Sequence, residues 1–288
     1  MKKIENSFLF FLILTISMTI AISYQIFAEN ITIASFNVLR LGDNSKDYET
    51  TAKVISKFDL IGLEEVMNEK GLKKLKAKLE SNTKIKWDYI ISEKPVGSKD
   101  YKEYYAFIYK KDKFQVATSL NTFKESNKNM FIREPFAAKF KSNNFDFIYI
   151  ICHSIFGDNE KNRILEASNY SKVYSYYSDI VPNEDDIIIA GDFNLPANDM
   201  AFQSLIEQNN LSYIINPNWF KTTLSDKGLS SSYDNIFINR EKTLEYTGRY
   251  GVYNYTKNNY KIVRKWISDH LPIFIEVDNI LDLDYKTS

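Results

Sequence analysis

The sequence has little of several residue types, and each shortage excludes a class of protein. One cysteine, Cys152, is present in 288 residues, so no disulfide can form within the chain and the fold must be held by its core. The formal net charge is zero, which argues against a protein whose main task is to coat nucleic acid. An enzyme that releases its product needs only a local positive strip, so that class stays open. The nine glycines and six prolines form no linker, and no repeat is present, so one domain is the simplest interpretation.

The first 28 residues predict a secretory signal peptide. A short basic start precedes an apolar run from Phe8 to about Ile22, and Ala28 provides a small residue at a plausible cleavage point. An uncleaved anchor is the alternative, because Ser7 to Ala28 is about long enough to cross a bilayer. In either case we expect residues 29–288 to be exported, as a secreted or periplasmic protein. After removal of the signal we expect no stable membrane association.

The rest of the chain alternates between two kinds of apolar pattern. Runs rich in β-branched and aromatic residues predict strands at Ile31–Phe36, Leu60–Leu63, Trp87–Ser92, Tyr104–Tyr109, Phe136–Phe140, Phe145–Cys152, Asp186–Ala190, Asn235–Ile238 and Pro272–Val277. Helical spacing predicts helices at Tyr48–Phe58, Leu72–Leu79 and Asn162–Val181. Interleaved elements with many strands favour an α/β sandwich whose sheets are covered by helices. From about Asn279 the chain is polar, and we expect a loose tail.

Polar side chains occur at the ends of six of these strands. They are Asn37, the pair Glu64 and Glu65, His153, the pair Asp192 and Asn194, Asp234, and the pair Asp269 and His270. In open α/β sheets, sites are assembled at strand ends, so we expect these side chains to meet. Within Ile187-Ile-Ile-Ala-Gly-Asp-Phe-Asn194 the glycine allows a turn. If the chain then stays extended, Asp192 and Asn194 face one side and Phe193 points into the core.

The two histidines, His153 and His270, are the only ones in the chain. A lone histidine beside a strand is more often structural, but two at strand ends among carboxylates favour acid/base chemistry. Acidic groups can hold a divalent ion that neutralises a phosphate. One histidine can then take a proton from water while the other protonates the leaving oxygen, each oriented by a carboxylate. Glu103 and Asp234 are candidates for that orienting role.

Glu64 and Glu65 are neighbours, and alternate side chains of a strand share a face. Only one of the two can therefore point into the site, and periodicity does not decide which. Trp219, Phe220 and Trp266 are most simply interpreted as core residues.

Taken in order, short motifs cover about Ile31 to Val277. They are Ser35-Phe-Asn37, Glu64-Glu-Val66, His153-Ser154, Gly191-Asp-Phe-Asn194, Tyr233-Asp234 and Ser268-Asp-His-Leu-Pro272. This series resembles the endonuclease/exonuclease/phosphatase superfamily. Ser92 to Tyr105 and Arg133-Glu-Pro135 are similar to the deoxyribonuclease I branch in particular. The resemblance implies an α/β (α+β) four-layer sandwich of two packed mixed β-sheets flanked by helices, forming one catalytic domain over residues 29–288.

The resemblance also implies a metal site. Glu65, directly before Val66, matches the principal metal-binding glutamate, and Asn37, Asp192 and Asp269 complete or support it. The implied cofactor is Mg²⁺, with Mn²⁺ as the alternative.

Further roles follow from the same resemblance. The implied catalytic residues are His153 paired with Glu103, His270 paired with Asp234, Asp192, and Asn194, which donates to the scissile phosphate. Tyr101, Arg133 and Asn194 match positions that contact DNA. The implied reaction is metal-assisted attack of water on a DNA phosphodiester, which leaves a 5′-phosphate and a 3′-hydroxyl, and we expect a monomer.

The chain departs from the family pattern at three places. Met67 stands where the most similar members have an arginine that enters the minor groove. Cys152 cannot form the usual disulfide. Asn129 replaces an expected acidic calcium ligand, and Thr222 to Ser232 lacks the clear pattern of a second calcium loop, so the case for Ca²⁺ is weak.

Two other function classes remain open at this point. A sphingomyelinase-like or inositol-phosphate hydrolase would use the same histidines and metal on another phosphate ester, and would show an exposed aromatic loop for membrane contact. A catalytically inactive binding module would keep the fold alone, but the full set of histidines and carboxylates argues against it.

Overall fold

The computed structural model describes residues 30–43, 45–126, 130–157 and 159–280. The predicted signal peptide, the calcium position Asn129 and the last part of the predicted tail lie outside the described residues. Within the described ranges, no helix is long and apolar enough to span a membrane.

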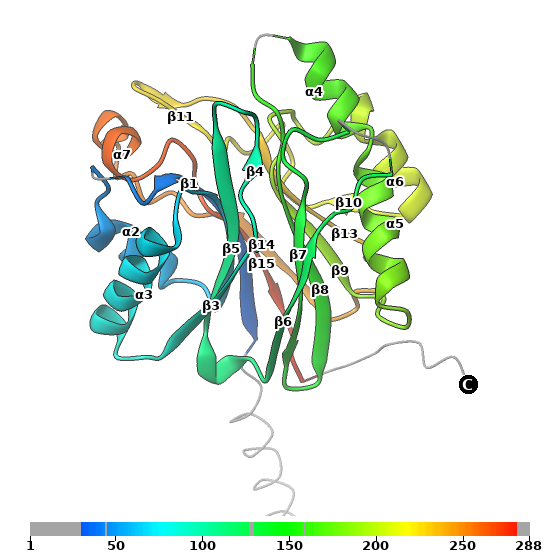
Figure 1. The fold of residues 1–288 in the computed structure, drawn as a ribbon, viewed down its shortest axis with the longest axis horizontal. Coiled ribbons are helices and arrows are strands. Elements are labelled where there is room, and N and C mark those ends of the chain that lie inside the picture. Colours follow the sequence, from blue (N-terminus) through cyan, green and yellow to red (C-terminus); the bar gives the residue numbers. More distant parts are fainter. Residues whose placement is uncertain (1–29, 44, 127–129, 158, 281–288) are drawn as a thin grey trace, which may run out of the picture.

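Two β-sheets form the middle of the molecule (Figure 1). The seven-stranded sheet has the order β14 (Tyr246–Val252), β15 (Ile273–Val277), β1 (Ile31–Leu41), β2 (Leu60–Val66), β5 (Lys102–Lys110) and β3 (Trp87–Ile91), with β4 (Val96–Gly97) beside β5. The six-stranded sheet has the order β10 (Ser212–Tyr213), β13 (Asp234–Ile238), β9 (Ile187–Asp192), β8 (Phe145–His153), β7 (Phe136–Ser142) and β6 (Val116–Thr122). β1 and β2 are parallel, as are β8 and β9, while their other neighbours are antiparallel, so both sheets are mixed. A hairpin of β11 (Leu224–Ser225) and β12 (Gly228–Leu229) stands apart.

Helices cover the outer faces of both sheets (Figure 1). α2 (Tyr48–Ile55) and α3 (Glu69–Thr83) pack on the first sheet, and α4 (Glu160–Ala167), α5 (Tyr170–Ile180) and α6 (Gln203–Asn209) lie on the second. The short elements are α7 (Tyr260–Trp266) and the 3₁₀ turns η1 (Lys111–Lys113) and η2 (Met200–Phe202). The arrangement confirms the predicted four-layer sandwich of two mixed sheets flanked by helices.

One predicted helix was wrong in its extent. The stretch Asn162–Val181 is two helices, α4 and α5, separated at Ser168 and Asn169. Both of these side chains donate to the carbonyl of Leu165, at 2.8 and 2.9 Å. Serine and asparagine compete in this way with the helical backbone, which is why the apolar spacing continues while the helix does not.

The core follows from strand alternation. Along β8, Phe147 and Tyr149 point between the sheets, whereas Ile148 and Ile150 point toward the helices. Alternate side chains of a strand face opposite sides of the sheet, so one strand contributes residues to two apolar layers. Phe193 is fully buried in the helix-covered layer, as predicted.

Buried tyrosine hydroxyls join the two sheets beneath the strand ends. The Tyr149 hydroxyl donates to the carbonyl of Ala34 at 2.6 Å, and the Tyr105 hydroxyl accepts from the backbone N–H of His153 at 2.9 Å. A buried hydroxyl with a partner fixes register, because leaving it unpaired would be costly. β8 of the second sheet is thereby tied to β1 and β5 of the first.

Candidate active site

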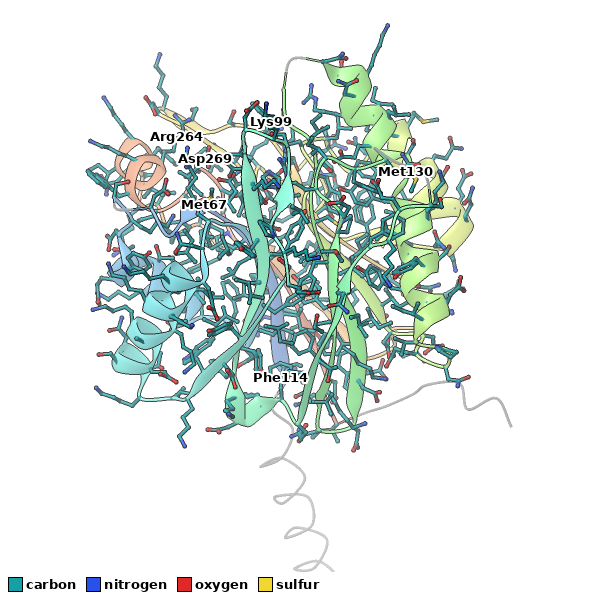
Figure 2. The ribbon with its side chains drawn as sticks, in the orientation of Figure 1. Met67, Lys99, Phe114, Met130, Arg264 and Asp269 are labelled. Carbon is teal, nitrogen blue, oxygen red and sulfur yellow. The ribbon has the colours of Figure 1, made fainter. Side chains whose placement is uncertain are left out.

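Most of the predicted polar residues meet in a cavity of about 740 Å³. Register brings some of them together, since His153 lies opposite Asp192 and Asp234 lies opposite Asp192. The cavity also receives Asn37, Glu65 and Asp269 from the first sheet and its loops. Met67, Lys99 and Asp269 lie at the end of the molecule opposite Phe114 (Figure 2). The prediction that these strand ends share one site is therefore consistent with the structure.

His153 forms a buried pair with Glu103. Its Nδ1 lies 2.7 Å from Glu103 Oε1, and the glutamate is fully buried at the second residue of β5. Burial alone would raise the pKa of Glu103, but the His153 imidazole and the Arg133 guanidinium hold it below its ordinary value. Burial lowers the pKa of His153, and the Glu103 carboxylate more than offsets this, so the pKa is raised.

His270 forms the second pair, with Asp234. Its Nδ1 lies 3.0 and 2.9 Å from the two carboxylate oxygens. Burial opposes the charged imidazole, yet Asp234 and Asp192 together raise the pKa of His270 well above its ordinary value. Burial raises the pKa of Asp234 despite its histidine partner. The two buried groups therefore titrate as a coupled pair and not independently.

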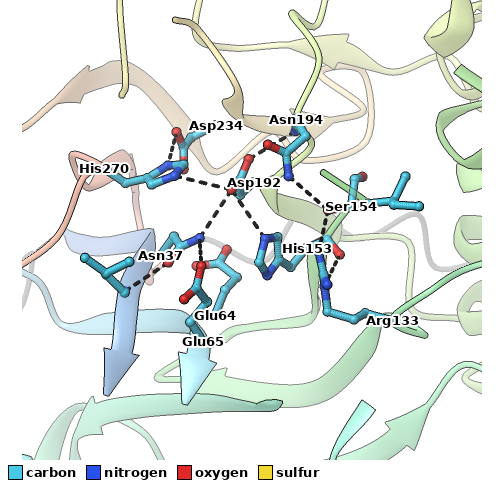
Figure 3. Close-up of polar contacts among 12 residues, drawn as sticks. Asn37, Glu64, Glu65, Arg133, His153, Ser154, Asp192, Asn194, Asp234 and His270 are labelled. Carbon is cyan, nitrogen blue, oxygen red and sulfur yellow. Dashed lines mark hydrogen bonds and ion pairs between the residues drawn. The ribbon is translucent and has the colours of Figure 1, made fainter. Parts of the chain in front are cut away.

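Asp192 lies between the two histidines (Figure 3). Its Oδ2 is 3.6 Å from His153 Nε2, 3.4 Å from His270 Nε2 and 3.2 Å from Asn37 Nδ2. Burial would raise the pKa of Asp192, but the two imidazoles lower it. Since each Nδ1 is held by its own carboxylate, both Nε2 atoms are left to face the cavity.

The turn at Gly191–Asn194 differs from the extended chain that we predicted. Gly191 has a φ of 149° and Asn194 a φ of 51°, so the chain turns sharply after β9. The Asn194 N–H donates to Asp192 Oδ1 at 3.0 Å, and the Asn194 amide donates to the carbonyl of Ser154 at 2.9 Å. Aspartate and asparagine form such local turns readily, which explains why strand periodicity fails here. Both side chains still line the cavity.

The structure separates the two neighbouring glutamates. Glu64 is fully buried and accepts from the Ser35 hydroxyl at 2.7 Å, and burial raises its pKa well above the ordinary value. Glu65 has a φ of 58°, at a bulge where β2 loses register with β5, and lines the cavity. Its Oε1 accepts from Asn37 at 3.1 Å. The bulge turns the second glutamate into the site, in agreement with the choice implied by the resemblance.

The oxygen-rich side of the cavity fits a hard divalent cation. Glu65, Asp192 and Asp269 offer carboxylate oxygens, and Asn37 offers an amide, which is the donor class that Mg²⁺ and Mn²⁺ prefer. A different grouping, Asp192 with Asp234 and His270, has ligand atoms within 4.8 Å of one another. Both Asp234 oxygens already contact His270, so we assign that grouping to proton transfer.

Tyr101 and Arg133, both predicted to contact DNA, line the cavity and also hydrogen-bond to groups of the site. The Tyr101 hydroxyl donates to Glu65 Oε2 at 3.0 Å and so orients that carboxylate. Arg133 is buried, and its guanidinium donates to the carbonyls of His153 and Ser154 at 3.0 and 2.7 Å. It also lies 3.9 Å from Glu103 Oε2. Arg133 therefore holds the backbone on which His153 sits.

Lys46 is a residue that sequence reasoning missed. Its ammonium donates to the carbonyls of Val38, Leu39 and Ile267, joining the end of β1 to the segment before Asp269. Burial lowers the pKa of Lys46 to about 8, although Glu65 and Asp269 act in the opposite direction. A lysine in a polar loop carries no signal of burial, so only tertiary contacts could have revealed it.

The remaining sequence predictions concern loops. Thr222 to Ser232 holds the hairpin of β11 and β12, where Asp226 is paired with Arg264 at 2.5 Å. The prediction that Trp219 is a core residue was wrong, because 74% of it is exposed, and Trp266 is 39% exposed. Phe220 is partly buried against the core. Burying one ring of the adjacent pair turns the other toward solvent.

Comparisons with known proteins agree with this geometry. Residues 34–270 match the family described as Endonuclease/Exonuclease/phosphatase. A deoxyribonuclease of Thioalkalivibrio sp. (strain K90mix) is 28% identical over 85% of this chain and 70% of its own length. Deoxyribonuclease-1 of Oryctolagus cuniculus is 23% identical over 90% and 96%, respectively. An endonuclease/exonuclease/phosphatase family protein from Leptotrichia buccalis C-1013-b superposes with a TM-score of 0.61 at 17% identity, covering 86% of this chain and 99% of that one, which shows a common fold.

Proposed function

Because the chain belongs to the endonuclease/exonuclease/phosphatase family, we propose that it is a divalent-metal-dependent endonuclease that hydrolyses DNA phosphodiester bonds to 5′-phosphate and 3′-hydroxyl ends. The observation that carries the proposal is the convergence of two histidine–carboxylate pairs on Asp192, with the Nε2 atoms of both histidines within 3.6 Å of its Oδ2 at the cavity. The deoxyribonuclease names of similar proteins support DNA as the substrate.

Side chains at the strand ends would hold the metal and the phosphate. Glu65, Asn37, Asp192 and Asp269 would hold the cation, which neutralises phosphate charge when bound. Asn194, anchored by Asp192 and Ser154, positions the phosphate.

We assign the two histidines different roles in this reaction. His270 faces both Asp234 and Asp192, which favour its charged form, so it donates a proton to O3′ as the O3′–P bond breaks. Burial and then the Arg133 cation both oppose the charged form of His153, so although Glu103 raises its pKa overall, the neutral form of this imidazole is more accessible than that of His270. His153 accordingly takes the proton of the attacking water as the new P–O bond forms.

Plasmid nicking with Mg²⁺ or Mn²⁺, with and without chelator, tests the activity. We expect nicking that requires the metal and that falls about 10²- to 10⁴-fold in His153→Ala and His270→Ala. Wild-type rates in these variants would contradict the assignment.

A finer test uses an oligonucleotide with sulfur in place of one bridging O3′, because a thiolate leaves without protonation. This substrate should restore cleavage by His270→Ala but not by His153→Ala; rescue of both or neither would refute the division of roles.

A lipid phosphodiesterase is a second candidate, and the exposed ring of Trp219 favours it. An aromatic side chain at the surface can enter the interfacial layer of a membrane. Hydrolysis of sphingomyelin vesicles, measured beside plasmid nicking, separates the two. Hydrolysis of the lipid without nicking would replace the first proposal.

We further propose that the protein is exported through its N-terminal segment. Sequencing the N-terminus of protein recovered from medium and periplasm tests both export and cleavage near Ala28. Protein that stays in the cytoplasm would refute export.

A further inference from the structure

Phe156 is an exposed aromatic residue at the edge of the active-site cavity. It follows His153 by three residues and lines the cavity, yet 72% of it is exposed. Single exposed apolar residues are common on protein surfaces. This one is distinguished by its position beside the proposed phosphate site.

The backbone that carries Phe156 is firmly held. Buried Glu166 accepts from the N–H of Ile155 at 2.8 Å and from the N–H of Ile132 at 2.9 Å. The preceding Ser154 contacts the Tyr170 hydroxyl at 2.6 Å through its own hydroxyl, and its carbonyl accepts from Arg133 at 2.7 Å. Phe156 thus follows directly on an anchored segment and presents its ring to solvent at the edge of the cavity. Ile132 and Ile155 line the same cavity and add apolar surface.

The cavity offers few positive charges to the phosphates that flank a groove of duplex DNA. Of the described residues that line it, Arg133 is the only lysine or arginine, and its guanidinium is engaged with two backbone carbonyls. Met67 lies 3.8 Å from the Tyr101 hydroxyl through its sulfur, and a thioether carries no charge for the phosphates beside a groove. Both forms of DNA bind through such cations, but the dependence is steeper for the duplex, whose charge density is higher.

We propose that Phe156 forms a stacking site for an unpaired nucleobase next to the scissile phosphate, so that the enzyme prefers single-stranded DNA to duplex DNA. This rests on the proposed function and narrows its substrate. An aromatic ring stacks on any base, but in a duplex the base faces are covered by their neighbours. A nucleotide that is already unstacked meets the ring without that cost.

Steady-state cleavage of a single-stranded oligonucleotide and of its duplex tests the proposal. For Phe156→Ala we expect KM on the single strand to rise roughly 5- to 100-fold with kcat nearly unchanged, and a much smaller change on the duplex. Phe156→Trp should retain the wild-type KM, and Phe156→Leu, which is apolar but lacks the ring, should lie between. Met200→Ala is the matched control, because Met200 is 75% exposed but does not line the cavity.

Single strands with one abasic position make the test specific. Near the scissile bond, one abasic position should raise the wild-type KM to the value of Phe156→Ala, and the variant should lose nothing further there. Equal effects of Phe156→Ala on both substrates, additive effects with every abasic position, or a wild-type preference for duplex would each overturn the stacking site while leaving the nuclease in place. If wild-type protein with Mg²⁺ or Mn²⁺ cleaves neither substrate, the proposed function itself fails, and the stacking site with it.

Discussion

Replacing Arg133 by methionine distinguishes a structural role from direct DNA contact. Methionine fills a similar volume but removes the guanidinium that donates to the carbonyls of His153 and Ser154. It also removes the cation 3.9 Å from Glu103 Oε2. All of these groups are buried, so water cannot easily replace the lost donors.

The expected loss of stability follows from these contacts. A hydrogen bond that involves a charged group contributes about 1.5–3 kcal/mol, and leaving a buried partner unpaired is costly. Part of the lost free energy of unfolding is recovered, because the variant no longer has to desolvate a buried arginine. We expect Arg133→Met to lower the free energy of unfolding by about 3–5 kcal/mol. For a domain of this size the midpoint of thermal unfolding should fall by about 6–20 °C.

Denaturant unfolding and steady-state kinetics measure the two roles separately. If Arg133 supports the backbone of His153, Arg133→Met should lower both the free energy of unfolding and kcat and leave the salt dependence of DNA binding unchanged. A phosphate contact predicts intact stability, a higher KM and a salt slope reduced by about one. Arg249→Met is the control, since the Arg249 side chain is 71% exposed and its ion pair with Glu276 should contribute less than about 1 kcal/mol. A midpoint for Arg133→Met equal to that of the control would refute the structural role.

Three further predictions concern the same region. Gly191→Ala should lower the free energy of unfolding by about 3 kcal/mol or more, because φ is 149° and an added Cβ would lie 1.9 Å from a backbone carbonyl oxygen. Gly228→Ala is the control, since nothing lies within 4 Å of its added Cβ, and should change the free energy of unfolding by less than about 0.5 kcal/mol. Similar denaturant midpoints for the two variants would contradict this. Glu103→Gln removes the carboxylate that raises the pKa of His153, so the neutral imidazole that accepts the proton persists to lower pH. The acid limb of the kcat/KM profile should therefore move to lower pH while the maximal activity falls. An acid limb that does not move would argue against the pairing of His153 with Glu103. Burial raises the pKa of the Cys152 thiol, so a thiol reagent at pH 8 should label it only after unfolding, whereas rapid labelling of native protein would show an accessible thiolate.

The sequence predicted the fold because its apolar patterns are local. Strands such as β8 and β9 are continuous apolar runs with covered faces on both sides, and their composition alone identifies them. The break between α4 and α5 was missed because Ser168 and Asn169 act through side-chain contacts that do not disturb apolar spacing. Trp219 was misplaced for a related reason, since composition does not tell which of two adjacent aromatic rings is buried.

The sequence by itself also determined which residues could do chemistry, because two histidines and a few acids stand at strand ends. What only the tertiary structure decided is how each of them is used. Glu65 enters the cavity through a bulge with positive φ, while Glu64 is buried beside Ser35. Arg133 turns inward to carbonyls from β8 and the loop after it. These outcomes depend on distant partners that compete for the same hydrogen bonds, and such competition is settled when the two sheets pack.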